Sequence, residues 1–192
     1  SAHPLTAYHS ELNAPRFGTL QAEDGQTMHY RLFAPKTLQQ DKKYPVIVSV
    51  YGGPHAQRVT NSWSPRDLYL HYLVQQGYLV FQLDNRGSYN RGKAFEDPIY
   101  KKLGEVELND QIRGVEYLRS LPYVAADKIA IYGHSYGGYM AIMAMFKASD
   151  YFAAGVSGAP VTDWALYDTH YTERYLGHPA ENAQGYTDSA VF

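Results

Sequence analysis

A serine at the centre of the pentapeptide Gly-His-Ser-Tyr-Gly is the side chain best placed in this sequence for covalent chemistry. Ser135 follows a short apolar run with β-branched residues, and an Ala- and Met-rich segment with helical character follows it. A strand, a sharp turn and a helix in this order form a nucleophile elbow, which lifts the serine hydroxyl above the sheet. Gly133, Gly137 and Gly138 leave room where strand and helix approach each other. The pattern favours a serine nucleophile over its alternative, a serine in an ordinary strand-to-helix turn.

The two neighbours of this serine differ in what they could contribute. The backbone N–H of Tyr136 would lie at a helix N-terminus, where it can stabilise a developing oxyanion. His134 carries a base directly beside the hydroxyl, but adjacent residues on a sharp turn point apart. We therefore expect Tyr136 to supply a hydrogen-bond donor and His134 to take no part in catalysis.

Strands and helices must alternate around the elbow to hold it. Asp24-Gly25 lies between two alternating runs, over residues 16–23 and 27–34, and this predicts a β-hairpin. Residues 161–192 contain tyrosines and a short helix but no clear strand. Besides the strand that enters the elbow, the hydrophobic pattern predicts buried strands over residues 45–51, 78–83 and 152–157, and helices over residues 66–76, 105–120 and from the elbow to about residue 147.

A hairpin followed by strands that alternate with helices predicts an α/β fold with a mostly parallel sheet. In such sheets the chemistry lies at the carboxyl ends of the strands. Loops follow the predicted strands there, after Tyr51, after Leu83 and around Ser135. The predicted domain covers residues 16–192 and follows an irregular lead-in over residues 1–15.

The helix predicted over residues 105–120 is amphipathic. Asp84 and Arg86 lie in a loop that precedes it, and we expect them to hold that loop rather than to act in catalysis. The apolar face of the helix consists of Val106, Ile112, Val115, Tyr117 and Leu118.

Composition narrows the function classes. The 192 residues suggest one domain, and 45% hydrophobic with 19% charged residues are ordinary for a globular protein. A net charge of −2 provides no basic field for nucleic acid, and no apolar run reaches the roughly 20 residues of a membrane span. The absence of cysteine excludes a disulfide framework, a thiolate zinc site and a cysteine nucleophile. No pattern indicates a metal or another cofactor, and the compartment stays open.

Five segments, in order along nearly the whole chain after residue 17, resemble one protein family. They are Val50-Tyr51-Gly52-Gly53-Pro54, Asp84-Asn85-Arg86-Gly87-Ser88, Gly133-His134-Ser135-Tyr136-Gly137-Gly138-Tyr139, Ala159-Pro160-Val161 and the stretch from Trp164 to Tyr175. The sequence resembles the catalytic domain of the prolyl oligopeptidase (S9) family of serine peptidases, which has an α/β-hydrolase fold. It is most similar to the dipeptidyl peptidase IV branch. The stretch from Trp164 to Tyr175 separates this branch from lipases and esterases, which share only the elbow. His134 departs from the Trp common at its position in the mammalian branch.

The resemblance implies a catalytic set. Ser135 would attack a peptide carbonyl and form an acyl-enzyme. The Tyr136 N–H and the Tyr51 hydroxyl would be the two oxyanion donors. The alternative for Tyr51 is an aromatic ring at a strand end that packs on the Gly-Gly-Pro loop.

The resemblance also implies a pocket for the substrate residue before the cleaved bond. A ring-lined apolar slot suits proline, which is compact and has no N–H to satisfy. Tyr167 and Tyr171 are four apart and would share one face of a helix, although an aromatic pair in the core has the same spacing. Glu173 and Arg174 are interpreted as a structural charge pair. The implied lining consists of Tyr136, Val161, Trp164, Tyr167 and Tyr171.

The acid and the base of a serine triad have no clear candidates. In this fold they follow the nucleophile in the order acid, then histidine. Only His170 and His178 follow Ser135, and both lie in the pocket segment, where the family has no base. The resemblance therefore implies a partial domain whose catalytic Asp and His lie beyond Phe192, and whose β-propeller is also missing. We expect the chain alone to be inactive and to associate through the sheet edge left at residues 152–157.

These observations predict a serine peptidase that releases N-terminal dipeptides with proline or alanine in the second position. Its partners would be a peptide substrate, the missing C-terminal half and β-propeller, and a second copy in a homodimer of the parent protein. An acylaminoacyl peptidase or an esterase of the same fold is the enzymatic alternative. A binding module that keeps the fold without catalysis is the non-enzymatic one.

Overall fold

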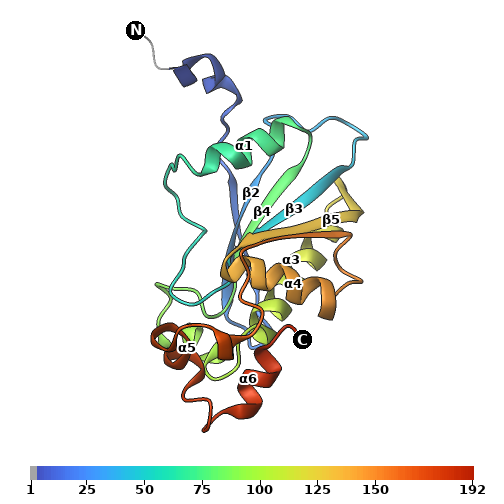
Figure 1. Cartoon of the computed structure of the whole chain (residues 1–192). Helices are drawn as coiled ribbons and strands as arrows, with labels where there is room; N and C mark the ends of the chain where they lie inside the picture. Colours follow the sequence, from blue (N-terminus) through green and yellow to red (C-terminus); the bar gives the residue numbers. More distant parts are fainter. Residues whose placement is uncertain (1–3) are drawn as a thin grey trace.

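A six-stranded mixed sheet forms the centre of the computed structural model, which describes residues 4–192 (Figure 1). β1 and β2 form the predicted antiparallel hairpin, and β2 pairs antiparallel with β4, whereas β4, β3, β5 and β6 run parallel. The predicted α/β fold with a mostly parallel sheet is therefore confirmed. In the spatial order β1-β2-β4-β3-β5-β6, the strands are β1 (Arg16–Gln21), β2 (Thr27–Phe33), β4 (Leu79–Asp84), β3 (Tyr44–Val50), β5 (Val124–His134) and β6 (Ala154–Gly158).

Helices cover both faces of the sheet. The α-helices are α1 (Asp67–Gln75), α2 (Lys93–Glu96), α3 (Glu105–Ser120), α4 (Tyr136–Lys147), α5 (Thr169–Leu176) and α6 (Ala183–Ser189), and the 3-10 helices are η1 (Pro4–Glu11), η2 (Asp97–Ile99) and η3 (Trp164–Leu166). α1 contacts β2 and β4 on one face, and α3 and α4 contact β5 on the other (Figure 1). Since both faces are covered there, β4 is buried along its whole length.

The direction of the chain across the sheet reverses at β3. The chain runs from β3 to β4 on one side, then crosses to β5 and β6 on the other. Such a reversal is a topological switch point, where sites form in open α/β sheets. Val50, the last residue of β3, pairs with Gly133 of β5. Tyr51 and Ser135 therefore emerge from the carboxyl ends of two neighbouring strands.

Several segments contain more regular structure than the sequence predicts. The lead-in, expected to be irregular, forms η1; β5 begins at Val124; and α2 and η2 fill part of the loop before α3. Short 3-10 segments depend on local bonds and leave no hydrophobic period in the sequence. After β6, η3, α5 and α6 form where one short helix is expected, and no strand occurs there among the described residues.

The buried face of α3 differs from the predicted apolar face. Two of the five predicted residues, Val115 and Leu118, are fully buried. Polar side chains of Glu107, Asp110 and Gln111 occupy other deeply buried positions of the helix. Hydrophobic spacing missed this face because polar residues do not contribute to an apolar pattern. The three residues that are only half-buried are Val106, Ile112 and Tyr117.

β6 forms one edge of the sheet and pairs only with β5. Its residues from Ala154 to Ser157 are exposed, and Val156 keeps 60% of its accessible surface. A sheet edge therefore lies where the sequence places it. Within residues 4–192, no helix is long and apolar enough to cross a membrane. The same part of the chain holds no cluster of His, Asp or Glu side chains suited to a metal ion.

Candidate active site

Ser135 lies in the turn between β5 and α4, as the sequence predicts. Its φ of 60° and ψ of −118° place it in a region that L-residues rarely adopt. Two backbone bonds hold this conformation: the Ser135 N–H donates to the Gly158 carbonyl at 2.8 Å, and the Ser135 carbonyl accepts from the Tyr139 N–H at 3.0 Å. The residue is only half-buried, so its side chain is accessible beside the strand ends.

Three glycines make this turn possible. A Cβ at Gly133 would overlap the backbone of Gly137, and a Cβ at Gly137 would overlap the carbonyl of Val50. A Cβ at Gly138 would overlap the carbonyl of Gly158. Backbone atoms of the sheet cannot move aside as a flexible side chain can. The close approach of helix and strands that the sequence predicts is therefore confirmed at each of the three positions.

Tyr136 begins α4, directly after the serine. The first N–H groups of a helix have no acceptor within it, so this N–H is free to point at a bound oxygen. The Tyr136 ring is buried, and its hydroxyl donates a hydrogen bond of 2.5 Å to Glu107 Oε1. Glu107 Oε2 accepts from the Gly104 N–H at 2.9 Å. The Tyr136 ring is thus anchored to the start of α3.

Burial dominates the electrostatics of this pair. The Glu107 side chain is fully buried, and desolvation raises its pKa to about 7 although the Tyr136 hydroxyl bond opposes the shift. Burial, with the Glu107 charge, raises the pKa of Tyr136 well above its usual value. The phenol therefore stays protonated and remains the donor in this hydrogen bond.

Tyr51 follows β3 and faces the elbow residue. Its ring centroid lies 6.0 Å from that of Tyr136. Gly53 allows this approach, because a Cβ there would lie 2.6 Å from the Tyr136 ring and 2.9 Å from the Tyr51 ring. Burial raises the pKa of Tyr51, and Tyr171 and the Arg58 guanidinium partly offset this. Tyr51 is therefore a protonated phenol that can donate a hydrogen bond at the strand ends.

The predicted pocket residues form one aromatic cluster. Trp164 is 1% exposed, and its ring centroid lies 5.4 Å from that of Tyr136 and 6.0 Å from those of Tyr167 and Tyr171. Tyr167 and Tyr171 meet at 5.6 Å with their rings almost perpendicular. Val161 is half-buried and packs against the core. The structure thus brings the five predicted lining residues to the same end of the sheet.

Tyr167 and Tyr171 are not on one helix, contrary to the prediction. The Asp168 side chain accepts a hydrogen bond from the Tyr171 N–H at 2.9 Å and caps α5, so the helix begins at Thr169. Tyr167 precedes the cap in extended conformation. The two rings still meet, because the residue before a cap can fold back onto the first turn. Tyr167 is 44% exposed and lies at the outer side of the cluster.

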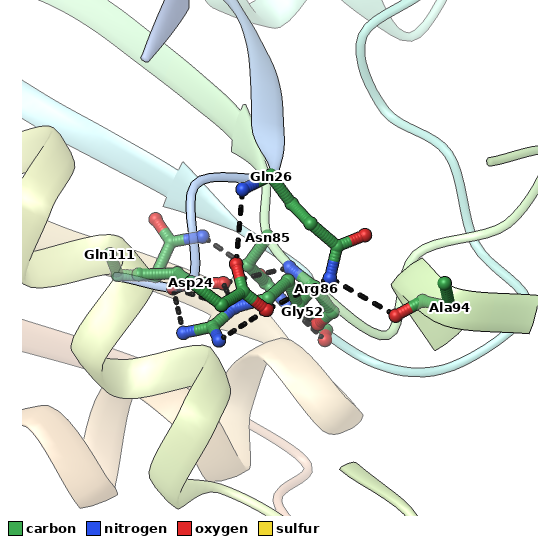
Figure 2. Close-up of polar contacts among 8 residues, drawn as sticks. Asp24, Gln26, Gly52, Asn85, Arg86, Ala94 and Gln111 are labelled. Atoms are coloured by element: carbon green, nitrogen blue, oxygen red, sulfur yellow. Dashed lines mark hydrogen bonds and ion pairs between the residues drawn. The ribbon is translucent and has the colours of Figure 1, made fainter. Parts of the chain in front are cut away.

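The loop after β4 is held as the sequence predicts. Asp84 accepts hydrogen bonds from the N–H groups of Arg58 and Val59, at 2.8 and 2.9 Å. Arg86 pairs with Asp110, with Nη2 at 2.7 Å from Oδ1, and its Nη1 reaches Asp24 in the hairpin turn at 3.1 Å. Figure 2 shows Arg86 between Asp24 of the hairpin turn and the neighbouring Asn85. Asp84 and Arg86 therefore hold the loops around the end of β4 in place.

His134, His170 and His178 are the histidines that lie beside or after the serine in the sequence. His134 is exposed, and its ring lies over Gly158. His170 Nε2 lies 3.4 Å from the Arg174 guanidinium, and His178 Nδ1 accepts from the Ala180 N–H at 3.2 Å. In the described part of the chain, none of these rings forms a hydrogen bond with Ser135.

Glu173 and Arg174 do not form the expected charge pair among the described residues. The Arg174 guanidinium contacts His170, one turn earlier on α5, instead. Adjacent residues on a helix project about 100° apart, which separates their charged ends.

Sequence reasoning missed three buried polar residues behind the site: Asn85, Glu107 and Gln111. The first is 0% exposed and lies between the loop after β3 and the helix α3. Glu107 and Gln111 are also almost completely buried. The one signal for them in the sequence is the spacing of Glu107 and Gln111, which lie four residues apart among the apolar positions of an amphipathic helix.

Comparisons with known proteins agree on one family. The prolyl oligopeptidase family matches residues 63–192. The chain is 43% identical over 188 residues to dipeptidyl peptidase 8 of Mus musculus, which covers 97% of this chain. It is 40% identical over 174 residues to a Neosartorya fischeri protein named "Probable dipeptidyl peptidase 4", covering 90% of this chain. A crystal structure of a "putative dipeptidyl aminopeptidase IV" from Bacteroides ovatus superposes with a TM-score of 0.90 at 42% identity, over 99% of this chain.

The chain spans only part of the length of these proteins. It covers 21% of the mouse protein, 23% of the fungal one and 27% of the Bacteroides chain. The shared part contains the mixed sheet, the elbow and the aromatic cluster. Its fold is accordingly a part of an α/β-hydrolase fold. On the family match and these identities, the chain belongs to the prolyl oligopeptidase (S9) family, in the branch of the dipeptidyl peptidase IV-like proteins.

Proposed function

We propose that this chain carries the nucleophile and proline pocket of a serine peptidase that releases N-terminal dipeptides with proline or alanine in the second position. The observation that supports this most is the Ser135 elbow beside an aromatic cluster. The serine has a positive φ of 60°, and the aromatic rings around Trp164 lie next to it through Tyr136. The relatives named as dipeptidyl peptidases support the substrate class.

In the proposed mechanism, the Ser135 hydroxyl attacks the carbonyl of the second residue of the peptide. The tetrahedral oxyanion accepts hydrogen bonds from the Tyr136 N–H and the Tyr51 hydroxyl. A base takes the proton of the Ser135 hydroxyl and passes it to the departing amine as the C–N bond breaks. This leaves an acyl-enzyme on Ser135, which water then hydrolyses. The raised pKa of Tyr51 supports this role, because the phenol must carry its proton at neutral pH to donate.

The aromatic cluster would bind the ring of proline. Tyr136, Trp164 and Tyr171 present flat apolar surfaces, and Tyr167 is partly exposed at its outer side. Proline has no N–H, so burying it against these rings leaves no donor of the substrate residue unpaired. Alanine is small enough to enter the same slot.

The proposal requires a base from residues outside this chain. His170 and His178 contact other groups, the His134 ring lies beside Gly158, and none of the three bonds to Ser135 within the described residues. Loss of the base of a triad lowers turnover by on the order of 10⁴ to 10⁶. We therefore propose that the 192-residue chain by itself is almost inactive. Wild-type-like turnover by this purified chain would contradict that.

The test uses the complete natural protein that contains these residues. Hydrolysis of an Ala-Pro anilide is compared with that of an acyl-alanine anilide and a short acyl ester. We expect selective cleavage of the Ala-Pro substrate, and we expect Ser135→Ala to abolish it. Preference for the blocked substrate or the ester would identify an acylaminoacyl peptidase or an esterase instead. Absence of all three activities, with no labelling of Ser135 by a fluorophosphonate, would identify a binding module.

The exposed edge strand supports a proposal on assembly. β6 offers unpaired backbone groups and the exposed side chain of Val156. We expect the isolated chain to associate with itself in solution. A monodisperse monomer that melts cooperatively, measured by light scattering and calorimetry, would contradict this.

A further inference from the structure

Helix α3 presents a face of buried polar side chains toward the site. Glu107, Asp110 and Gln111 are 0%, 1% and 1% exposed. They are spaced three and four residues apart, so they lie on one side of the helix. Burying polar groups is unfavourable unless their hydrogen bonds are made. Each of the three side chains has at least one partner, although Gln111 Oε1 has none among the described residues. Their partners lead to the two proposed oxyanion donors.

The first connection reaches the elbow. Glu107 accepts the 2.5 Å hydrogen bond from the Tyr136 hydroxyl and a second bond, of 2.9 Å, from the Gly104 N–H. The carboxylate is therefore immobilised at the start of α3, and the ring of Tyr136 is tied to it. Because that ring belongs to the residue whose N–H faces the oxyanion, α3 sets the orientation of the first donor.

The second connection reaches the loop that carries Tyr51. Gln111 Nε2 donates to Asn85 Oδ1 at 2.9 Å and to the Leu83 carbonyl at 3.2 Å. Asn85 Nδ2 in turn donates to the Gly52 carbonyl at 2.9 Å (Figure 2). Gly52 directly follows Tyr51 and has a φ of 79°, so this carbonyl belongs to the turn that directs the Tyr51 phenol.

The third connection fixes Asn85 from its other side. Asp110 accepts from the Arg86 N–H at 2.9 Å and from the Arg86 guanidinium at 2.7 Å. The Arg86 carbonyl then accepts from Asn85 Nδ2 at 2.7 Å. The Asn85 amide is thus held by the Gln111 donor on its oxygen and by two carbonyls on its nitrogen. Only an amide in this orientation satisfies all three partners.

We propose that the buried polar face of α3 positions both oxyanion donors: Glu107 positions Tyr136, and Gln111 and Asp110, acting through Asn85, position Tyr51. The inference rests on the proposed roles of these two donors at Ser135. An oxyanion donor contributes only when it meets the developing charge at hydrogen-bond distance. Tyr51 lies on a turn with two glycines, and the Asn85 bond replaces the rigidity that such a turn lacks. The three α3 residues and Asn85 are therefore positioning residues.

The test is a double-mutant cycle on kcat in the complete natural protein. Asn85→Asp keeps the size of the side chain but places an oxygen against the carbonyls of Gly52 and Arg86. We expect kcat for the Ala-Pro anilide to fall by about 10- to 100-fold while KM changes by less than about threefold, because oxyanion donors act in the transition state. In a Tyr51→Phe background the same substitution should lower kcat by less than about threefold.

Val115→Ala is the matched control. Val115 is fully buried on the same helix but packs in the hydrophobic core, so the variant should lower the melting temperature and leave kcat unchanged. Equal losses of kcat from Asn85→Asp with and without Tyr51→Phe would overturn the inference. If Asn85→Asp fails to fold, Gln111→Met carries the same cycle, since it removes the Gln111 donor to Asn85 and to the Leu83 carbonyl but keeps the Asn85 amide.

The proposed function and the positioning role can fail separately. The rate at which a fluorophosphonate labels Ser135 needs the nucleophile and its oxyanion donors but no peptide substrate. Labelling without Ala-Pro hydrolysis would reject the substrate class only. The double-mutant cycle of Asn85→Asp and Tyr51→Phe would then be measured as changes in the labelling rate. Ala-Pro hydrolysis with an additive cycle would reject the positioning role only. Neither hydrolysis nor labelling would reject both.

Discussion

The elbow and the aromatic cluster lie beside each other at the switch point of the sheet, but different contacts hold them. At the elbow, backbone meets backbone: Gly133, Gly137 and Gly138 leave no space for a single Cβ. In the cluster, rings meet rings at 5.4 to 6.0 Å around Trp164, and Tyr167 keeps 44% of its surface. The backbone around Ser135, the proposed nucleophile, therefore has little freedom to move, whereas the proposed pocket beside it can adjust.

The two kinds of contact suit the two tasks proposed for this site, which are to place a nucleophile precisely and to bind a substrate side chain reversibly. A nucleophile must be placed within tenths of an ångström of the reacting carbon, and backbone contacts provide that. A specificity pocket must accept a side chain and release it, and ring surfaces in partial contact with solvent allow this. Substitutions should accordingly affect stability and kcat at the elbow and its donors, and KM at the outer part of the cluster.

The largest effect is expected at the elbow itself. Gly137→Ala places a Cβ on the carbonyl of Val50, where neither backbone can retreat. We expect the free energy of unfolding to fall by about 3 kcal/mol or more, or folding to fail, measured by soluble yield and urea unfolding. Gly77→Ala is the control, because its φ is 94° but its Cβ meets nothing; about 1 to 2 kcal/mol is expected there. Equal losses would show that conformation, rather than contact, determines the elbow.

The second largest effect is expected at Tyr51, whose ring lies beside Tyr136 between the elbow and the aromatic cluster. Tyr51→Phe removes the phenol but keeps the ring that packs on Tyr136. We expect kcat to fall by about 10² to 10³ with little change in stability, because one of the two proposed oxyanion donors is lost. Tyr69→Phe, on the exposed side of α1, should leave kcat unchanged. A wild-type kcat for Tyr51→Phe in steady-state assays would assign Tyr51 to packing alone.

The pH dependence of stability tests the anchor of the elbow ring. Burial raises the folded-state pKa of Glu107 to about 7, above its unfolded value, so the folded state binds more protons between about pH 4.5 and 7. The stability from this group is therefore present below about pH 4.5 and lost as the pH rises through about 7, by about 3 kcal/mol. Urea unfolding across this range should show the decline, and Glu107→Gln should flatten it. An identical pH dependence in both proteins would mean that the carboxyl titrates normally.

The smallest effect is expected at the outer part of the cluster. Tyr167→Ala removes a half-exposed ring from the proposed proline pocket. We expect the unfolding free energy to change by about 1 kcal/mol or less, while KM for the Ala-Pro anilide rises by about 5- to 10-fold. Leu166→Ala is the neighbouring control, since Leu166 is 85% exposed, and its KM should not change. A fall in kcat with constant KM would place Tyr167 at the reacting bond instead.

Local sequence patterns predicted the elements well and their boundaries less well. The hairpin around Asp24-Gly25, the strands and the main helices all form, because turn residues and apolar periods act over short distances. The start of β5 and the helices α2, α5 and α6 were missed or shortened. Their limits depend on caps and tertiary contacts, such as the Asp168 side chain that delays the start of α5 past Tyr167.

The sequence by itself determined the elbow. Glycine is the only residue that fits at Gly133, Gly137 and Gly138, and this requirement can be recognised from residue types and spacing alone. The contacts that support the elbow are visible only in the folded structure. The bonds from Glu107 to Tyr136, and from Gln111 through Asn85 to Gly52, join residues 26 to 33 positions apart. No local pattern encodes such a network, because each polar side chain becomes favourable in the core only when a distant partner is folded against it.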